Sequence, residues 1–141
     1  MEHGMKKIGH LGIAVKDIEQ SNELFTKLLG AAPYKAEAVE SENVITSFFK
    51  TGESKIELLQ ATSEDSPIAK FIDKKGEGIH HIAFAVDDIY AEIKRLKSEG
   101  FRMIHDEPKT GADNKLIAFL HPKSTNGVLI EICMDKPESG E

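Results

Sequence analysis

Two segments of this chain, 71 residues apart, carry the same residue pattern. GHLGIAVKDI begins at residue 9 and HHIAFAVDDI begins at residue 80. When they are aligned, His10 matches His81 and Asp17 matches Asp88. Self-similarity at a fixed offset indicates repeated structural units. The repeat therefore predicts a fold made of two similar modules.

Each copy predicts a strand that leads into a helix and then three further strands. An apolar run is followed by an aspartate that can cap a helix, by apolar residues at helical spacing, and by a glycine that can end the helix. These glycines are Gly30 and Gly100. The strands predicted after the helices are APYKAEAV, VITSFF and KIELLQA in the first half, and FRMIH, KLIAFL and GVLIEIC in the second.

The two halves predict an α+β fold of two tandem βαβββ modules. Module one covers about residues 8–61 and module two about residues 79–134, within a single domain of residues 1–141. Between them, Ser66 followed by Pro67 predicts the start of a linker helix over about residues 66–75. We expect the strands to form a curved mixed sheet, shaped as a cup around one site.

The composition excludes several classes of function. The chain has 141 residues, 40% of them hydrophobic, which is enough for a sizeable core. One cysteine, Cys133, allows no internal disulfide, and the net charge of −6 argues against general binding of nucleic acid or anionic lipid. No secretory h-region or membrane-spanning stretch is present in the sequence. We therefore expect a cytoplasmic protein whose partner is a small molecule or a second copy of itself.

Small residues accompany both repeated histidines. Side chains on a strand alternate between faces, so His10 shares a face with Gly12 and Ala14. His81 shares its face with Ala83 and Ala85, while the bulky residues of both strands point the other way. This pattern predicts that the histidine face lines a cavity and that a helix covers the opposite face.

The last strands of the two halves each contribute a glutamate to this pattern. Glu57 in KIELLQ and Glu131 in LIEICM are 74 residues apart, close to the spacing of the histidines. Two imidazoles and two carboxylates buried together are costly unless they are paired, and a divalent cation would pair them. The sequence therefore predicts a metal site at His10, Glu57, His81 and Glu131.

A structural interpretation of the same residues stays open, because a single histidine in an apolar strand often has only a structural hydrogen bond. His80 precedes His81, so alternation places it on the opposite face and predicts that it is a poor ligand. Gln60 could replace Glu57 as a ligand only if the strand had a bulge. Cys133 has apolar neighbours and is expected to be an inert core thiol.

At these residues the chain resembles the vicinal oxygen chelate superfamily over about residues 8–134. DSPIAKFI, GIHHIAFAV and FLHPKSTNGVLIEI resemble the methylmalonyl-CoA epimerase family within it. The resemblance implies metal ligands at His10, His81 and Glu131, with the fourth at Glu57. Some epimerases use glutamine at this fourth position, whereas glyoxalase I enzymes use glutamate. Some epimerases also have an additional glutamate, proposed as a base, where this chain has Thr46.

The resemblance implies an isomerase that epimerises methylmalonyl-CoA at its α-carbon through a metal-stabilised enolate. Glu131, and more weakly Glu57, are the expected bases, and Lys123 and Lys115 are the expected contacts of the CoA phosphates. The metal would be cobalt, nickel, manganese, zinc or magnesium, and a homodimer is expected. Two other functions stay open: glyoxalase I (lactoylglutathione lyase), and a non-catalytic protein that binds a small molecule in the same cup.

Overall fold

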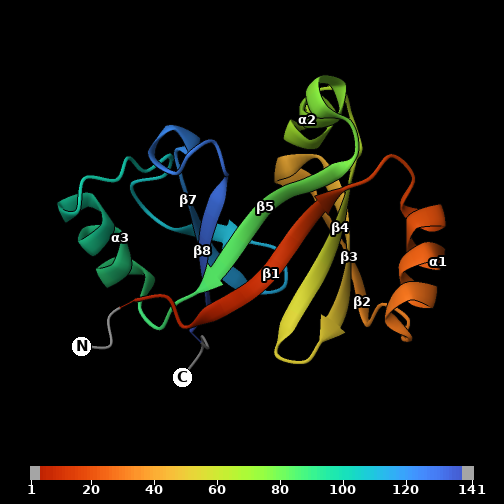
Figure 1. Ribbon diagram of the computed structural model, residues 1–141, viewed down its shortest axis with the longest axis horizontal. Helices are drawn as coiled ribbons and strands as arrows, with labels where there is room; N and C mark the ends of the chain where they lie inside the picture. The colour runs from red at the N-terminus through yellow and green to blue at the C-terminus, as the bar shows by residue number, and fades with distance from the viewer. Residues whose placement is uncertain (1–3, 138–141) are drawn as a thin grey trace. The chain divides into compact units, whose positions relative to one another are not determined.

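The computed structural model describes residues 4–137, which contain helices and strands in two repeated runs (Figure 1). The α-helices are α1 (Ile18–Leu29), α2 (Pro67–Lys75) and α3 (Ile89–Ser98), and the short 3-10 helices are η1 (Glu40–Glu42) and η2 (Pro122–Ser124). The strands are β1 (Lys7–Ala14), β2 (Lys35–Val39), β3 (Val44–Thr51), β4 (Ser54–Ala61), β5 (Gly78–Ala85), β6 (Lys109–Gly111), β7 (Lys115–Leu120) and β8 (Ile130–Asp135).

The described chain forms two compact units. The central unit consists of residues 10–81, and the terminal unit consists of the described parts of residues 1–9 and 82–141. The order β1-α1-β2-β3-β4 recurs as β5-α3-β6-β7-β8, and α2 lies between the two runs in the sequence. The predicted α+β class with two βαβββ modules is therefore confirmed.

In the central unit, the strands lie in the order β2-β3-β4-β1. β1 and β4 are parallel, and their register places Gly12 opposite Glu57. β3 and β4 are antiparallel, with Phe48 opposite Glu57 on the other side. Parallel pairing of β1 and β4 thus places Glu57 opposite the residue that lies two positions after His10 on β1.

In the terminal unit, the strands lie in the order β5-β8-β7-β6. β5 and β8 are parallel and place Ala83 opposite Glu131, while β7 is antiparallel to β8 and places Phe119 opposite the same glutamate. The two modules therefore use equivalent registers, because Ala83 stands two residues after His81 as Gly12 does after His10.

The central sheet has apolar clusters on both faces. Under α1, Phe49 and Leu58 are buried together with partly buried Ile13 and Phe25. On the other face, Ala14, Val44, Leu59 and Ile68 form a second cluster, which Phe71 and Ile72 of α2 join. In the terminal unit, the apolar side of α3 packs on β7 and β8. The prediction that a helix covers the bulky face of β1 is confirmed by the contact of Ile13 with the α1 cluster.

The helices begin and end as the sequence predicts. Asp17 caps α1 by accepting the Gln20 N–H, and Asp88 caps α3 by accepting the N–H groups of Tyr90 and Ala91. Gly30 follows α1 with φ 82°, in the left-handed region where a side chain would be strained. None of the helices within residues 4–137 combines the length and apolar character that crossing a membrane requires.

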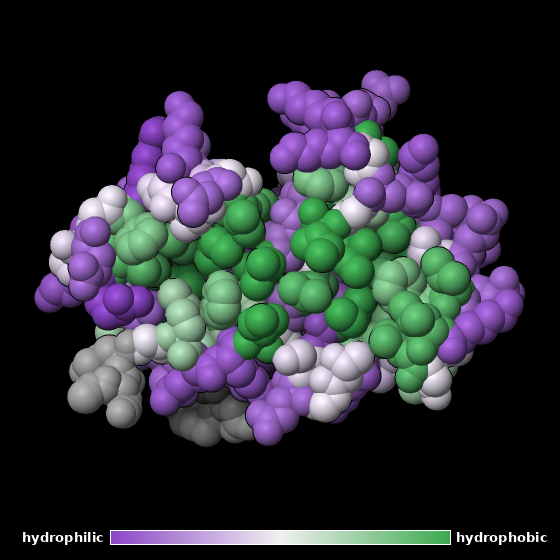
Figure 2. Space-filling view, in the orientation of Figure 1, coloured by the Kyte–Doolittle hydropathy of each residue, from purple (hydrophilic) through white to green (hydrophobic). Residues whose placement is uncertain are grey.

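Two leucines of α1 are exposed, although they lie among the apolar residues at helical spacing. Leu24 and Leu28 are 61% and 69% exposed, and Figure 2 shows apolar surface over this helix. The residues that α1 packs on the sheet are Ile18, Phe25 and Leu29. The apolar residues of α1 extend around the helix beyond the arc that the sheet can cover.

The predicted strand FRMIH is wrong. Met103 forms only an isolated bridge to Leu120, and the first strand after α3 is β6 instead. Phe101 and Met103 pack on the α3 cluster, which explains the alternating apolar pattern. The Arg102 N–H, just before the bridge, is bonded to the Ser124 side chain at 3.0 Å and not to a strand.

Replacement of the α3 cap tests the repeated helix signal. Asp88→Ala should lower the free energy of unfolding by about 1 kcal/mol, because the side chain accepts two N–H groups at the start of the helix. Urea denaturation measures the change. Asp87→Ala is the matched control: it removes the same charge one residue earlier, and its exposed 3.2 Å pair with Lys6 contributes about 0–1 kcal/mol. Equal losses in the two variants would contradict the assigned capping role.

Candidate metal centre

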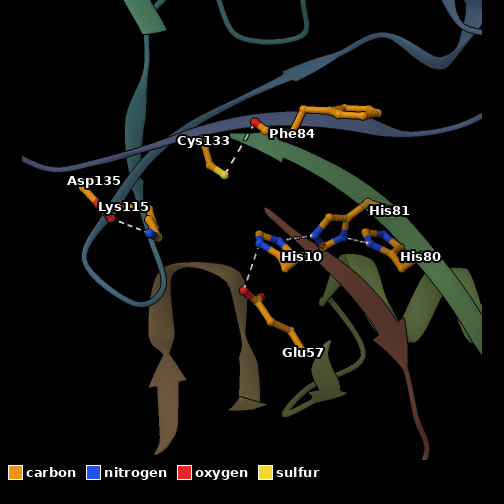
Figure 3. Close-up of polar contacts among 8 residues, drawn as sticks. All are labelled: His10, Glu57, His80, His81, Phe84, Lys115, Cys133 and Asp135. Atoms are coloured by element: carbon orange, nitrogen blue, oxygen red, sulfur yellow. Dashed lines mark hydrogen bonds and ion pairs between the residues drawn. The ribbon is translucent and has the colours of Figure 1, made fainter. Parts of the chain in front are cut away.

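Two buried histidines of the central unit meet through their Nε2 atoms. His10 on β1 and His81 on β5 are 5% and 6% exposed. Their Nε2 atoms lie 3.1 Å apart, and the rings are nearly perpendicular at 87° (Figure 3). The structure therefore brings together the two histidines that the repeat singles out.

Glu57 approaches the other side of the His10 ring. Its Oε2 lies 3.2 Å from His10 Nδ1, and the glutamate is 7% exposed. An ionised carboxylate only accepts hydrogen bonds, so it favours the His10 tautomer with a proton on Nδ1. That tautomer leaves the Nε2 lone pair directed toward His81.

Gly12 provides the space that the His81 ring occupies. A Cβ at residue 12 would lie 2.2 Å from His81 Cε1 and 2.5 Å from its Nδ1. No side chain tolerates such a distance, so the ring lies directly against the β1 backbone. The predicted small-residue lining of the histidine face is confirmed at this position, and the close approach gives it a physical reason.

His80 lies closer to His81 than strand alternation predicts, while its prediction as a poor ligand stays a prediction. Alternation predicts that His80 and His81 lie on opposite faces of the strand, but their Nδ1 atoms are 3.0 Å apart. Nδ1 is bonded directly to Cγ, close to the backbone, so the Nδ1 atoms of neighbouring rings can approach each other. Phe71 of α2 holds the His80 ring from another side, in an edge-to-face contact with centroids 5.0 Å apart.

The three central-unit residues fit a metal ion in geometry and in chemistry. One ligand atom from each of His10, Glu57 and His81 can be chosen so that all lie within 4.8 Å of one another. Two nitrogens bound at about 2.1 Å to one ion, at a right angle, lie about 3.0 Å apart. The observed Nε2 separation of 3.1 Å is close to this value. Two imidazoles and a carboxylate therefore form a candidate ligand set.

Glu131, the fourth predicted ligand, belongs to the terminal unit. It lies on β8 with 3% exposure, between Ala83 of β5 and Phe119 of β7. Cys133, two residues further along, is buried, and its Sγ lies 3.6 Å from the Phe84 carbonyl oxygen. The assignments of Glu131 as a ligand and as a base stay predictions.

The two lysines predicted to contact CoA lie on different elements of the terminal unit. Lys115 on β7 forms an ion pair with Asp135 on β8. Lys123 lies exposed in η2, where its backbone N–H is bonded to His121 Nδ1 at 3.1 Å. The ammonium group of Lys115 therefore has a carboxylate partner, while η2 holds Lys123 at the surface.

Thr46 occupies a buried position on β3. It is fully buried opposite Leu59 of β4, and its Oγ1 has no hydrogen-bond partner among residues 4–137. On β3 it shares a face with Phe48, which pairs with Glu57. The face that bears Glu57 thus has a buried hydroxyl group at the position where some epimerases have an additional glutamate.

A separate cavity of about 420 Å³ in the terminal unit contains none of the predicted site residues. It is lined in part by Glu92 and Arg95 of α3, which form an ion pair at 2.6 Å. The hydrogen bonds that Arg95 donates to the Glu92 carboxylate raise the pKa of Arg95 above its usual value. Glu92 is therefore a buried carboxylate with a structural partner.

The sequence matches the glyoxalase/bleomycin resistance protein/dioxygenase superfamily over residues 9–119. It is 41% identical to the ethylmalonyl-CoA/methylmalonyl-CoA epimerase of Cereibacter sphaeroides over 128 residues, which cover 89% of this chain and 96% of that protein. Identity to a probable lactoylglutathione lyase of Vibrio cholerae is 25% over 130 residues, which cover 92% and 91% of the two chains.

The fold is similar to a solved variant of methylmalonyl-CoA epimerase from Streptomyces coelicolor, in complex with 2-nitronate-propionyl-CoA. The TM-score is 0.88 at 34% identity, with 94% of this chain and 96% of that chain covered. The chain therefore belongs to the glyoxalase/bleomycin resistance protein/dioxygenase superfamily and, within it, to the methylmalonyl-CoA epimerase family.

Proposed function

We propose that this protein is an isomerase that epimerises methylmalonyl-CoA at its α-carbon with the help of a divalent metal ion. The observation that carries the proposal is the buried meeting of His10, His81 and Glu57, in a chain 41% identical to an epimerase of this substrate class. The α-carbon lies between a thioester and a carboxylate, so loss of its proton places negative charge on oxygen. A cation bound at the site supplies an electrophile for that charge.

The two histidines act as neutral ligands in this proposal. The Glu57 carboxylate accepts a hydrogen bond from the Nδ1–H of His10, so the Nε2 lone pair of His10 is available to the cation. The burial of both rings keeps water from competing for the same positions. Glu57 is proposed either as a direct ligand or as the group that orients His10.

Proton transfer needs a carboxylate beside the α-carbon, and we propose Glu131 for this role. Its carboxylate would take the α-proton from one face of the substrate, and a proton would return to the opposite face. Glu57 is the second, weaker candidate for a base. Thr46 is no candidate, because a neutral hydroxyl group does not accept a proton from carbon at neutral pH.

Substrate binding also requires cations near the CoA phosphates. Lys123 is the better candidate, since its side chain is exposed on η2, whereas Lys115 is paired with Asp135. The metal is proposed to be cobalt, nickel, manganese, zinc or magnesium, because imidazoles and carboxylates suit all of these to different degrees. A homodimer stays a prediction.

Glyoxalase I is the second candidate function. The observation that favours it is the carboxylate at residue 57, since glyoxalase I enzymes carry glutamate where some epimerases carry glutamine. Its reaction also moves a proton on a carbon next to a carbonyl group, so the same cation and base would serve. The lower identity of 25% to a lactoylglutathione lyase places it behind the epimerase. A non-catalytic binding protein is the third candidate.

Hydrogen exchange at the α-carbon tests the proposed reaction. Methylmalonyl-CoA incubated in heavy water with metal-loaded protein should gain one deuterium, detected by mass spectrometry. Glu131→Gln should lower the exchange rate by at least ~10²-fold, because general-base catalysis contributes about 10²–10⁴-fold. Glu99→Gln, which removes an exposed carboxylate, is the control.

Absence of exchange above a protein-free sample would exclude the epimerase. The hemithioacetal of methylglyoxal and glutathione would then be the substrate to test for glyoxalase activity. Inactivity toward both substrates, with retained affinity for a CoA thioester, would favour the non-catalytic binding protein.

A methyl group at residue 12 tests the metal centre without removing a ligand. Gly12→Ala places a Cβ 2.2 Å from His81 Cε1, so the ring must move from His10. The affinity for Zn²⁺ should fall by about 10-fold or more, in the range expected when a ligand loses its orientation. Competition with a chromophoric chelator measures it.

Gly4→Ala is the matched control, because a Cβ at residue 4 meets nothing within 4 Å. Unchanged Zn²⁺ affinity in Gly12→Ala would contradict His81 as a ligand at this position.

A further inference from the structure

We propose that His80 is a positioning residue that orients His81 toward the metal ion. In the metal-loaded protein, the Nδ1 atom of His80 accepts the Nδ1 proton of His81, which leaves the lone pair on His81 Nε2 free for the ion, as the lone pair on His10 Nε2 is. This inference rests on the proposed metal centre and deepens it. It concerns the hydrogen bond and the tautomer of His81, and requires no change in its charge.

The geometry supports a direct hydrogen bond between the neighbouring rings. The Nδ1 atoms of His80 and His81 are 3.0 Å apart and the rings are nearly perpendicular at 88° (Figure 3). A neutral imidazole has one donor and one acceptor nitrogen, so one Nδ1 must donate and the other must accept. The two nitrogens of each ring are therefore coupled: the role of Nδ1 fixes the role of Nε2.

This coupling determines which atom His81 presents to His10. If His81 donates from Nδ1, its Nε2 carries a lone pair that can bind a cation. If it accepts at Nδ1, its Nε2 carries a proton and cannot. His10 is held in the equivalent ligand tautomer by Glu57. His80 therefore stands in the same relation to His81 as Glu57 does to His10.

His80 is itself held in place by packing. Phe71 of α2 makes an edge-to-face contact with its ring, at 5.0 Å and 83°. Phe71 belongs to the apolar cluster of Ala14, Leu59 and Ile68 in the central unit. An orienting group is effective only if its own position is fixed, and this contact fixes it. The His81 ring is bounded on another side by the backbone at Gly12.

A purely structural role for His80 makes a different prediction. If the residue only fills space against Phe71, any flat aromatic side chain should replace it. If it orients His81, the nitrogen acceptor is what matters and the ring is secondary. Phenylalanine keeps the ring and removes the acceptor. Asparagine loses the ring but can place its amide oxygen one bond beyond Cγ, where histidine has Nδ1.

The experiment compares Zn²⁺ binding by the wild type, His80→Phe and His80→Asn. His80→Phe should bind Zn²⁺ about 10–100-fold more weakly, the usual effect of losing a partner of a metal-binding histidine. His80→Asn should recover most of this loss. Nitrogen-detected NMR of zinc-loaded wild type should show His81 protonated at Nδ1 and bare at Nε2. Thermal unfolding of the metal-free variants checks that they fold.

The outcomes separate this inference from the proposed function. If the wild type binds Zn²⁺ and His80→Phe binds it equally well, His80 does not position His81 and the metal centre stands. Equal weakening in His80→Phe and His80→Asn, or His81 bare at Nδ1 in the zinc-loaded protein, would also overturn the inference. If the wild type binds no Zn²⁺, the proposed metal centre fails and the inference fails with it.

Discussion

The arrangement of each module depends on the parallel pairing of its first and last strands. In the central unit this pairing sets Gly12 opposite Glu57, and in the terminal unit it sets Ala83 opposite Glu131. A parallel pair needs a crossover, and the helix and two further strands of each module provide it. Because side chains alternate on a strand, a histidine two residues before the paired position shares its face with that position. One backbone rule, applied twice, therefore specifies where the imidazole and the carboxylate of each module belong.

Burial gives the site its chemical character. His10, His81 and Glu57 are each less than a tenth exposed, yet all three carry polar nitrogen or oxygen atoms. Burying such groups is unfavourable unless their hydrogen-bonding capacity is used. The carboxylate of Glu57 and the two imidazoles use part of it on one another, and the orientation that results directs Nε2 toward Nε2. The same contacts that reduce the cost of burial therefore bring together the candidate ligands of the proposed metal centre.

Much of the fold could be predicted because its signals are local. The helix starts at Asp17 and Asp88 depend on a side chain and N–H groups within three residues, so the sequence alone identifies them. The segment FRMIH was wrongly predicted as a strand, because an alternating apolar pattern indicates burial on one side of the chain and not pairing with another strand. Phe101 and Met103 are partly buried against α3, but the backbone makes a single bridge. Strand pairing depends on residues that are distant in the sequence, and a local apolar pattern carries no information about them.

The repeat predicts that His10 and His81 have equivalent surroundings. The surroundings differ where the two imidazole rings meet. His10 follows a glycine and has Glu57 at its Nδ1, whereas His81 follows His80 and has that ring at its Nδ1. Gly12 has no side chain because the His81 ring lies against it, while Ala83, its counterpart, keeps a methyl group. A Cβ at residue 12 would lie 2.2 Å from His81 Cε1, so the position of the His81 ring requires glycine there. The differences between the two copies of the repeat are therefore as informative about the site as the residues that they share.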